Sequence, residues 1–190
     1  MIKLVVGLGN PGREHEFNRH NIGWLAMDQL SFYDSLNWQK KFKGQYADYN
    51  LNGQKVYFLK PDTYMNLSGE SVIKISQFFK ILPEEILVVH DELDLAFGEV
   101  NLKSAGGFAG HNGLKSIGEV LGVNTFKRLR LGIGRPAHGN VASYVLSNFS
   151  QDEEQHVEIY FSKSAKIIED CIAFGFQKSA NQNSKKKLLI

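Results

Sequence analysis

A chain of 190 residues is the size of a single domain, and its 43% hydrophobic and 22% charged residues place it among globular proteins rather than disordered or fibrous ones. Its formal net charge is only +2, so a nucleic-acid-binding function would require local clustering of charge. The single cysteine, Cys171, cannot form an internal disulfide, which favours a reducing compartment. No apolar stretch approaches the roughly 20 residues of a membrane span, so we expect a cytoplasmic protein without a membrane partner.

The first half of the chain predicts a strand, a helix and a hairpin. Residues 4–8 are short and apolar and end at the turn residues 9–12, as in a buried strand. Apolar residues then recur at helical spacing from Asn21 to about Asp34. Asn52-Gly53 is typical of a two-residue hairpin turn.

The middle of the chain predicts one helix and then two strands, the second of which leads into a glycine-rich segment. Ser68 stands where it would cap a helix with a regular apolar face. The apolar run 86–89 predicts a strand that ends at His90-Asp91. A further strand from Glu99 to Lys103 leads into the glycine-rich segment 106–113.

The last third predicts a helix, a strand and a longer helix. A helix follows the glycine-rich segment, and apolar residues alternate with arginines over residues 128–133, as in a strand. Ser150 and Glu153 form a capping box for the final helix, which Gly175 is expected to end. We expect residues 175–190 to be a mobile tail.

The order of these elements predicts the fold class. Strands that alternate with helices are typical of an α/β protein, and the hairpin adds antiparallel strands to the sheet. We therefore expect one three-layer domain over residues 1–190, with a twisted mixed sheet flanked by helices.

One motif suggests a dinucleotide site but lacks the required context. Residues 7–12 spell G-x-G-x-x-G directly after a strand. That fingerprint needs a helix starting at the turn and a second strand ending in an acid about 20 residues on, where this sequence predicts helix. The sequence therefore argues against a dinucleotide cofactor, although a plain turn leaves Asn10 unexplained.

No protein nucleophile is evident, so a hydrolase of this sequence has to activate water. There is no G-x-S-x-G motif, and Cys171 falls on the apolar face of the last helix. Water activation needs a general base, a group that orients it and polar groups that hold the substrate. Arg19-His20-Asn21, residues 90–94 and residues 110–113 offer such groups. Taken singly, a helix cap, a solvated acidic loop and a flexible connection explain them equally well.

Taken together, six motifs resemble those of the bacterial peptidyl-tRNA hydrolases in order and spacing. They are Gly9-Asn10-Pro11-Gly12, Arg19-His20-Asn21-x-Gly23, Lys60-Pro61-x-Thr63-Tyr64-Met65-Asn66-x-Ser68-Gly69, His90-Asp91-Glu92-Leu93-Asp94, Gly110-His111-Asn112-Gly113-Leu114-Lys115-Ser116-Ile117 and Phe126-x-Arg128-Leu129-Arg130-x-Gly132-Ile133-Gly134-Arg135-Pro136. The likeness covers about residues 2–150 and continues more loosely through the last helix. It implies an esterase that cleaves the bond between a peptide and the 3′ ribose of tRNA.

The resemblance also implies roles for particular side chains. His20 would be the base that takes a proton from the attacking water, and Asp91 would hold its imidazole in the correct tautomer and favour its charged form. Asn10, Asn66 and Asn112 would hydrogen-bond the peptide and ester, since amides offer donors and acceptors without charge. In the family, the residue matching Asn10 also helps to distinguish N-blocked peptidyl-tRNA from aminoacyl-tRNA.

Three further residues are expected to contact substrate in the same cleft. The resemblance places His111 and Tyr64 in its lining. His15 stands where the family usually has tyrosine, and Asn18 where it often has threonine. A histidine at position 15 keeps stacking and hydrogen bonding but changes charge near neutral pH.

Basic residues concentrate in one part of the chain. From Lys103 to Arg135 there are six lysines and arginines against one acid, Glu119, which suits a phosphate-binding face. Charged residues also alternate along a strand simply because one of its faces is exposed to solvent. Lys103 and Arg130 match family positions that contact tRNA phosphate, so they are the expected tRNA contacts.

The resemblance thus implies a monomeric esterase of the peptidyl-tRNA hydrolase type, and this scheme needs no metal or organic cofactor. A non-catalytic RNA-binding protein on the same fold is one alternative, although the chain keeps both His20 and Asp91. A metal-dependent hydrolase using Asp91, Glu92, Asp94 and a histidine is another, but surrounding asparagines compete poorly for a hard divalent ion.

Overall fold

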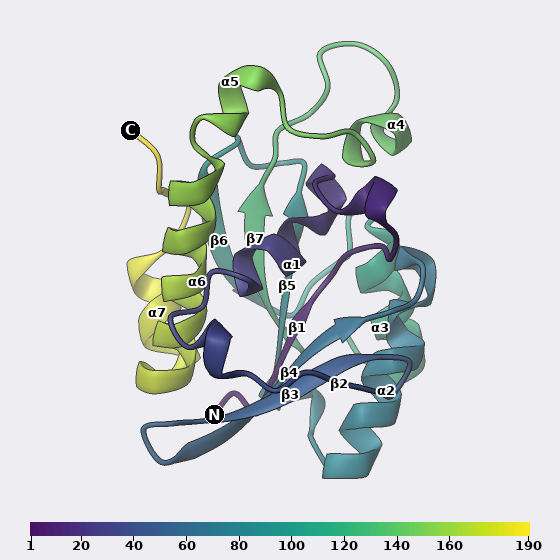
Figure 1. Ribbon diagram of the computed structural model, residues 1–190, viewed down its shortest axis with the longest axis vertical. Helices are drawn as coiled ribbons and strands as arrows, with labels where there is room; N and C mark the ends of the chain where they lie inside the picture. Colours follow the sequence, from purple (N-terminus) through teal and green to yellow (C-terminus); the bar gives the residue numbers. More distant parts are fainter.

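The computed structural model describes all 190 residues and contains one eight-stranded sheet (Figure 1). The strands are β1 (Leu4–Gly7), β2 (Gln39–Lys41), β3 (Gly44–Leu51), β4 (Gln54–Pro61), β5 (Ile86–Glu92), β6 (Glu99–Ser104), β7 (Lys127–Gly132) and β8 (Lys186–Lys187). Their order across the sheet is β2-β3-β4-β1-β5-β7-β6-β8. The sheet is mixed, because β4, β1, β5 and β7 are parallel while β2, β3, β6 and β8 pair with their neighbours antiparallel.

Helices cover both faces of the sheet, which confirms the predicted three-layer α/β fold (Figure 1). They are α1 (Ile22–Met27), α2 (Ser68–Phe79), α3 (Asn112–Leu121), α4 (Val141–Val145), α5 (Gln151–Glu154), α6 (Val157–Phe174) and α7 (Phe176–Gln182). One face forms the larger core with α1, α6 and α7, and the other forms a smaller core with α2 and α3. None of the helices combines the length and apolar character that crossing a membrane requires.

The central parallel strands are buried along their whole length. Every residue of β1 and β5 is buried, because helices lie on both sides of them. β5 nevertheless continues through the polar residues His90, Asp91 and Glu92 at its carboxyl end. Parallel strands bring their carboxyl ends to one edge of the sheet, and this edge is where ligands bind in such folds.

The first helix is much shorter than predicted. The sequence indicated a helix from Asn21 to about Asp34, but α1 ends at Met27. Beyond it the backbone amides of Gln29 and Leu30 donate to carbonyls three residues back. These tighter turns keep Leu30 buried in the core without a continuing α-helix, which is why the apolar spacing was misleading.

Ser68 does not cap α2 as predicted, because it is the first residue within the helix. Its hydroxyl donates to the carbonyl of Met65 at 2.8 Å. The amide of Gly69 instead donates to the hydroxyl of Ser116 in α3, 2.9 Å away. One amide at the start of α2 is therefore satisfied by the neighbouring helix, an arrangement that depends on tertiary contact.

The C-terminal part follows the prediction up to Gly175. Ser150 and Glu153 form the capping box, although a break at His156 divides the expected helix into α5 and α6. Gly175 ends α6 with a φ of 96°, a conformation that suits glycine. The sequence did not predict α7 or β8, which pairs with β6. The expected mobility of residues 175–190 stays a prediction, and these contacts favour an ordered end.

Close contact between α1 and the sheet depends on Gly23. A Cβ atom there would lie 2.6 Å from the amide nitrogen of Leu8. We predict that Gly23→Ala lowers the free energy of unfolding by about 1–3 kcal/mol, since overpacking forces the helix away from the sheet. Urea-induced unfolding measures the change. Gly107→Ala is the control, because a Cβ there meets nothing within 4 Å. Equal stability of Gly23→Ala and the original protein would contradict the prediction.

Candidate active site

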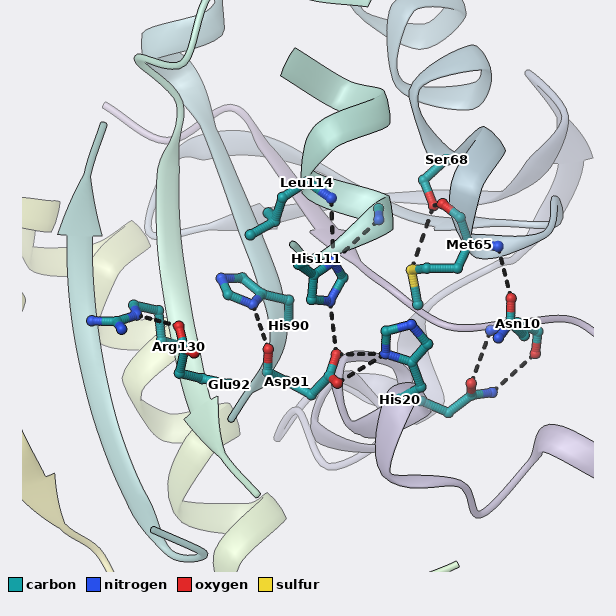
Figure 2. Close-up of polar contacts among 12 residues, drawn as sticks. Asn10, His20, Met65, Ser68, His90, Asp91, Glu92, His111, Leu114 and Arg130 are labelled. Carbon is teal, nitrogen blue, oxygen red and sulfur yellow. Dashed lines mark hydrogen bonds and ion pairs between the residues drawn. The ribbon is translucent and has the colours of Figure 1, made fainter. Parts of the chain in front are cut away.

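Three side chains meet at the carboxyl end of β5, with Asp91 between two histidines (Figure 2). Asp91 Oδ2 and Oδ1 lie 2.8 and 2.9 Å from Nδ1 of His20. Oδ1 also lies 2.8 Å from Nε2 of His111. The side chains of His20, Asp91 and His111 are 10%, 2% and 9% exposed. The predicted pair of His20 and Asp91 is thus brought together, and His111 joins it from the other side.

Local structure determines which nitrogen of each histidine faces Asp91. His111 is the N-cap of α3, and its Nδ1 accepts hydrogen bonds from the amides of Gly113 and Leu114 at 3.1 and 3.3 Å. An accepting Nδ1 carries no proton, so His111 has its proton on Nε2 and donates it to Asp91. His20 lies on a 3-10 turn (Arg19–Asn21) directly before α1 and contacts Asp91 through Nδ1. In its neutral form Nε2 of His20 then keeps a free lone pair.

Attraction between opposite charges determines the pKa values of Asp91 and His20. Burial by itself raises the pKa of Asp91, but the neighbouring His20 and His111 outweigh burial and hold it far below its ordinary value. Burial lowers the pKa of His20, yet the charge of Asp91 and its hydrogen bond outweigh this and raise it. Asp91 is therefore ionised at neutral pH and favours a proton on His20.

Asn10 is fixed beside His20 by a set of hydrogen bonds. Its backbone amide donates to Oδ1 of Asn21 at 2.8 Å, and Nδ2 of Asn21 donates to its carbonyl at 3.0 Å. Its own Oδ1 accepts from the amide of Met65 at 2.7 Å (Figure 2). The side-chain NH₂ of Asn10 therefore stays available as a donor. Sequence reasoning did not give Asn21 or Met65 this positioning role, although both stand inside the motifs.

A cavity of about 390 Å³ opens over this cluster. Its base includes His20, His90 and Asp91, and Asn112 lies at its rim, exposed. One wall is the glycine-rich loop, defined here as residues 105–110, and the other is α4. The cavity is thus bounded by two segments that come from different parts of the chain.

The α4 wall is tied to the turn that carries His20. Arg19 donates to the hydroxyl of Ser147, the carbonyl of Asn148 and a carboxylate oxygen of Glu153, at 2.5–2.6 Å. Its guanidinium also lies 4.2 Å from the ring centre of Tyr144. Arg19, beside the expected base, therefore fixes one wall of the cavity relative to it.

Asn10 and the remaining predicted peptide contacts are not among the residues that line this cavity. Tyr64 is 66% exposed and lines a second, open hollow together with Pro11. Asn66 is exposed on the 3-10 turn Met65–Leu67. His15 lies on another such turn, where its Nδ1 is 3.0 Å from Nδ2 of Asn18. Substrate contact by Tyr64, Asn66 and His15 stays a prediction.

More of the basic residues on the predicted phosphate-binding face are already bonded within the protein than the sequence indicated. Arg130 donates from Nε to Glu92 at 2.8 Å, and Arg135 pairs with Asp94 at 2.6 Å. Arg128 is buried beneath the glycine-rich loop and bonds its carbonyl groups. Exposed Lys103 keeps its charge free of an acidic partner, and the Nη groups of Arg130 also remain unpaired.

These ion pairs also bear on metal binding. In the metal-dependent alternative Glu92 and Asp94 would be ligands, but each is paired with an arginine. Ligand atoms of His20, Asp91 and His111 do lie within 4.8 Å of one another. A metal there would have to displace both histidine–aspartate hydrogen bonds and the Nε2 proton of His111.

After residues 9–12 the chain forms only the 3-10 turn Arg13–His15, so the helix that a dinucleotide site requires is missing.

Comparison with known proteins extends over nearly the whole chain. The family model described as Peptidyl-tRNA hydrolase matches residues 4–189. The chain belongs to the peptidyl-tRNA hydrolase family. This membership confirms the resemblance seen in the six sequence motifs.

Members of this family from several bacteria align with most or nearly all of the chain. The peptidyl-tRNA hydrolase of Geotalea uraniireducens is 43% identical over 99% of this chain and 99% of its own. That of Rickettsia africae is 46% identical over 81% of this chain and 84% of its own. The crystal structure of peptidyl-tRNA hydrolase from Acinetobacter baumannii matches with a TM-score of 0.91 and 36% identity, over 99% of this chain and 97% of that one.

The electrostatic coupling within the cluster can be measured. Because the charge of Asp91 raises the pKa of His20, we predict that Asp91→Asn lowers it, so that His20 stays neutral to a lower pH. The acidic limb of the pH–rate profile should then move to lower pH, while the maximal rate falls because the imidazole is held less firmly. NMR titration of the His20 ring measures the pKa directly. An unchanged His20 titration in folded Asp91→Asn would rule out the coupling.

Proposed function

We propose that the protein hydrolyses the ester bond between a peptide and the 3′ ribose of tRNA, with His20 as general base. The observation that carries this proposal is the buried contact of 2.8 Å between Nδ1 of His20 and Asp91 at the base of a cavity. The contact leaves Nε2 of neutral His20 free to accept a proton. Family membership supports the reaction class and the substrate.

The reaction follows from the protonation states of the cluster. Nε2 of His20 takes a proton from a water molecule as the water oxygen attacks the ester carbonyl. The resulting imidazolium is stabilised by Asp91, whose pKa is well below neutrality. When the tetrahedral intermediate collapses, the ribose 3′ oxygen leaves and takes that proton from His20. A free carboxylic acid and a tRNA with a 3′ hydroxyl result.

Amide side chains suit the task of holding the acyl group. Asn10 uses its Oδ1 on the amide of Met65, so its NH₂ group is oriented to donate to a substrate carbonyl. Asn112 at the cavity rim and exposed Asn66 would bind further peptide or ester groups. His111, fixed between α3 and Asp91, would line the site, and Tyr64 and His15 would contact the substrate farther out.

The tRNA body would bind along β6 and β7. Lys103 is exposed on β6, and Arg130 of β7 has free Nη groups on the same face, since Lys103 pairs with Arg128 and Asn101 with Arg130 across the two strands. Two cations in this place suit a phosphate group of the RNA backbone. We propose further that the protein acts as a monomer in the cytoplasm and without a metal or organic cofactor.

The base is tested by removing it. We predict that His20→Ala lowers kcat by about 10²–10⁴-fold, while folding and tRNA binding are largely retained. Hydrolysis of N-acetyl-aminoacyl-tRNA measures turnover, with unblocked aminoacyl-tRNA as the substrate control. His156→Ala, an exposed histidine at the start of α6, is the matched variant and should behave as the original protein. Near-normal turnover of His20→Ala would end the proposed mechanism, and turnover that depended on an added divalent ion after chelation would favour the metal-dependent one.

The phosphate contact is tested by comparing two substrates. We predict that Lys103→Ala lowers kcat/KM on N-acetyl-aminoacyl-tRNA but scarcely changes hydrolysis of N-acetyl-aminoacyl-adenosine, which lacks the tRNA body. Its log–log salt dependence should flatten by about one unit. The double variant Lys103→Ala/Arg130→Ala should lower kcat/KM on the full tRNA further and flatten the salt dependence more. Loss of Arg130 also leaves Glu92 without its ion-pair partner. Lys166→Ala on α6 is the control for loss of one exposed charge. Equal losses on both substrates would place the phosphate contact elsewhere.

A further inference from the structure

Arg128 differs from the other basic residues of β7 in being almost completely buried. It is 2% exposed, although it stands in a strand whose alternating charges suggest a wet face. Its side chain points beneath the glycine-rich loop, on the same face of the sheet as Lys103, its partner across the two strands. A buried guanidinium needs partners for its donors, so its contacts indicate what it does.

Those contacts are to the backbone of the glycine-rich loop. Nη1 of Arg128 donates to the carbonyl of Gly107 at 2.7 Å, and Nη2 donates to the carbonyl of Gly106. The guanidinium carbon lies 5.0 Å from the ring centre of Phe108 and 5.2 Å from that of Phe126. The two rings are parallel within 8°. Arg128 therefore binds two consecutive carbonyls and holds the next side chain through its charge.

The loop has few means of holding this shape by itself. Gly106 and Gly110 have positive φ, and so do Ala105 and Ala109, at 70° and 48°. Alanine is strained in this region of φ and keeps it only where its surroundings impose it. The loop is also partly exposed, with Gly107, Ala109 and Gly110 open to solvent. Its conformation thus depends on anchors from outside.

A second anchor acts through Phe108. Its ring lies directly over Gly118 of α3, where a Cβ would meet a ring carbon at 2.5 Å. After Phe108 the chain reaches His111, which caps α3 and donates to Asp91. The position of His111 and its neighbour Asn112 is therefore set by α3 on one side and by the glycine-rich loop on the other.

We infer that Arg128 is a positioning residue for the reaction: it fixes the glycine-rich loop, and through it His111 and Asn112, relative to Asp91. The inference rests on the proposed function for its effect on catalysis. It also removes Arg128 from the expected phosphate face. With both Nη groups bonded to the loop and almost no exposed surface, the side chain cannot reach an RNA backbone in this conformation.

The test removes the loop contacts while keeping the volume of the side chain. Arg128→Met loses both hydrogen bonds to the loop, and Arg128→Gln, which keeps one NH₂ group, is the milder variant should Arg128→Met not fold. Lys127→Met is the matched control, because Lys127 lies next along β7 and bonds the carbonyl of Glu84, away from the loop. Activity is measured on N-acetyl-aminoacyl-tRNA and on N-acetyl-aminoacyl-adenosine, and hydrogen exchange is measured over residues 105–111.

If Arg128 is a positioning residue, its replacement should lower kcat/KM by the same factor on both substrates. We expect kcat/KM of Arg128→Met to fall about 10- to 100-fold on each, since misplacing a contact group by about 1 Å costs this much. The salt dependence on the full substrate should be unchanged, and the amides of residues 105–111 should exchange faster than in Lys127→Met. A loss confined to the full tRNA with a flatter salt dependence would show a phosphate ligand instead, and it would overturn the inference, as would unchanged exchange in the loop.

Failure of this inference can be told apart from failure of the proposed function. The unaltered protein tests the function, because absence of hydrolysis on both esters would reject it. Hydrogen exchange tests the anchoring of the loop directly and does not depend on turnover.

Discussion

Burial of the Asp91 carboxylate is the constraint around which the site is organised. An ionised carboxylate at the end of a fully buried strand is unfavourable unless donors replace the lost water. The two donors come from remote parts of the chain: His20 from the turn before α1, and His111 from the cap of α3. Satisfying one charge therefore brings together helices from opposite faces of the sheet. The same requirement orients the proposed base, because the nitrogen used on Asp91 leaves the other free.

Two buried arginines hold the walls of the cavity in a comparable way. Arg19 binds the segment around α4 and α5, while Arg128 binds the glycine-rich loop. Each combines hydrogen bonds to backbone carbonyls or side chains with an aromatic face. A planar guanidinium can donate to several acceptors at once. It therefore suits segments whose carbonyl groups lack the regular backbone hydrogen bonds of a helix or sheet. The shape of the site thus depends on charges that do not take part in its chemistry.

Local patterns in the sequence predicted those features that depend on local interactions. The apolar runs of β1 and β5, the Asn52-Gly53 turn and the Ser150 capping box were all found in the structure. The pairing of His20 with Asp91 followed from motifs rather than from spacing. The burial of Arg128 could not be predicted, because an alternating strand looks solvated until a loop from elsewhere covers it. The early end of α1 was missed for a similar reason, since tight turns bury the same apolar residues.

The pairing of β8 with β6 has a consequence for folding. Lys186 and Lys187 pair with Val100 and Glu99 at the start of the outer edge of β6, and Lys163 of α6 adds a hydrogen bond to the carbonyl of Leu188. Until these residues arrive, β6 presents unpaired backbone groups, which favour association with another chain. During synthesis the start of β6 therefore stays unpaired on this side after the other strands of the sheet have emerged. Truncation near residue 185 would make that unpaired state permanent and so promote aggregation of a chain whose proposed catalytic groups are all present.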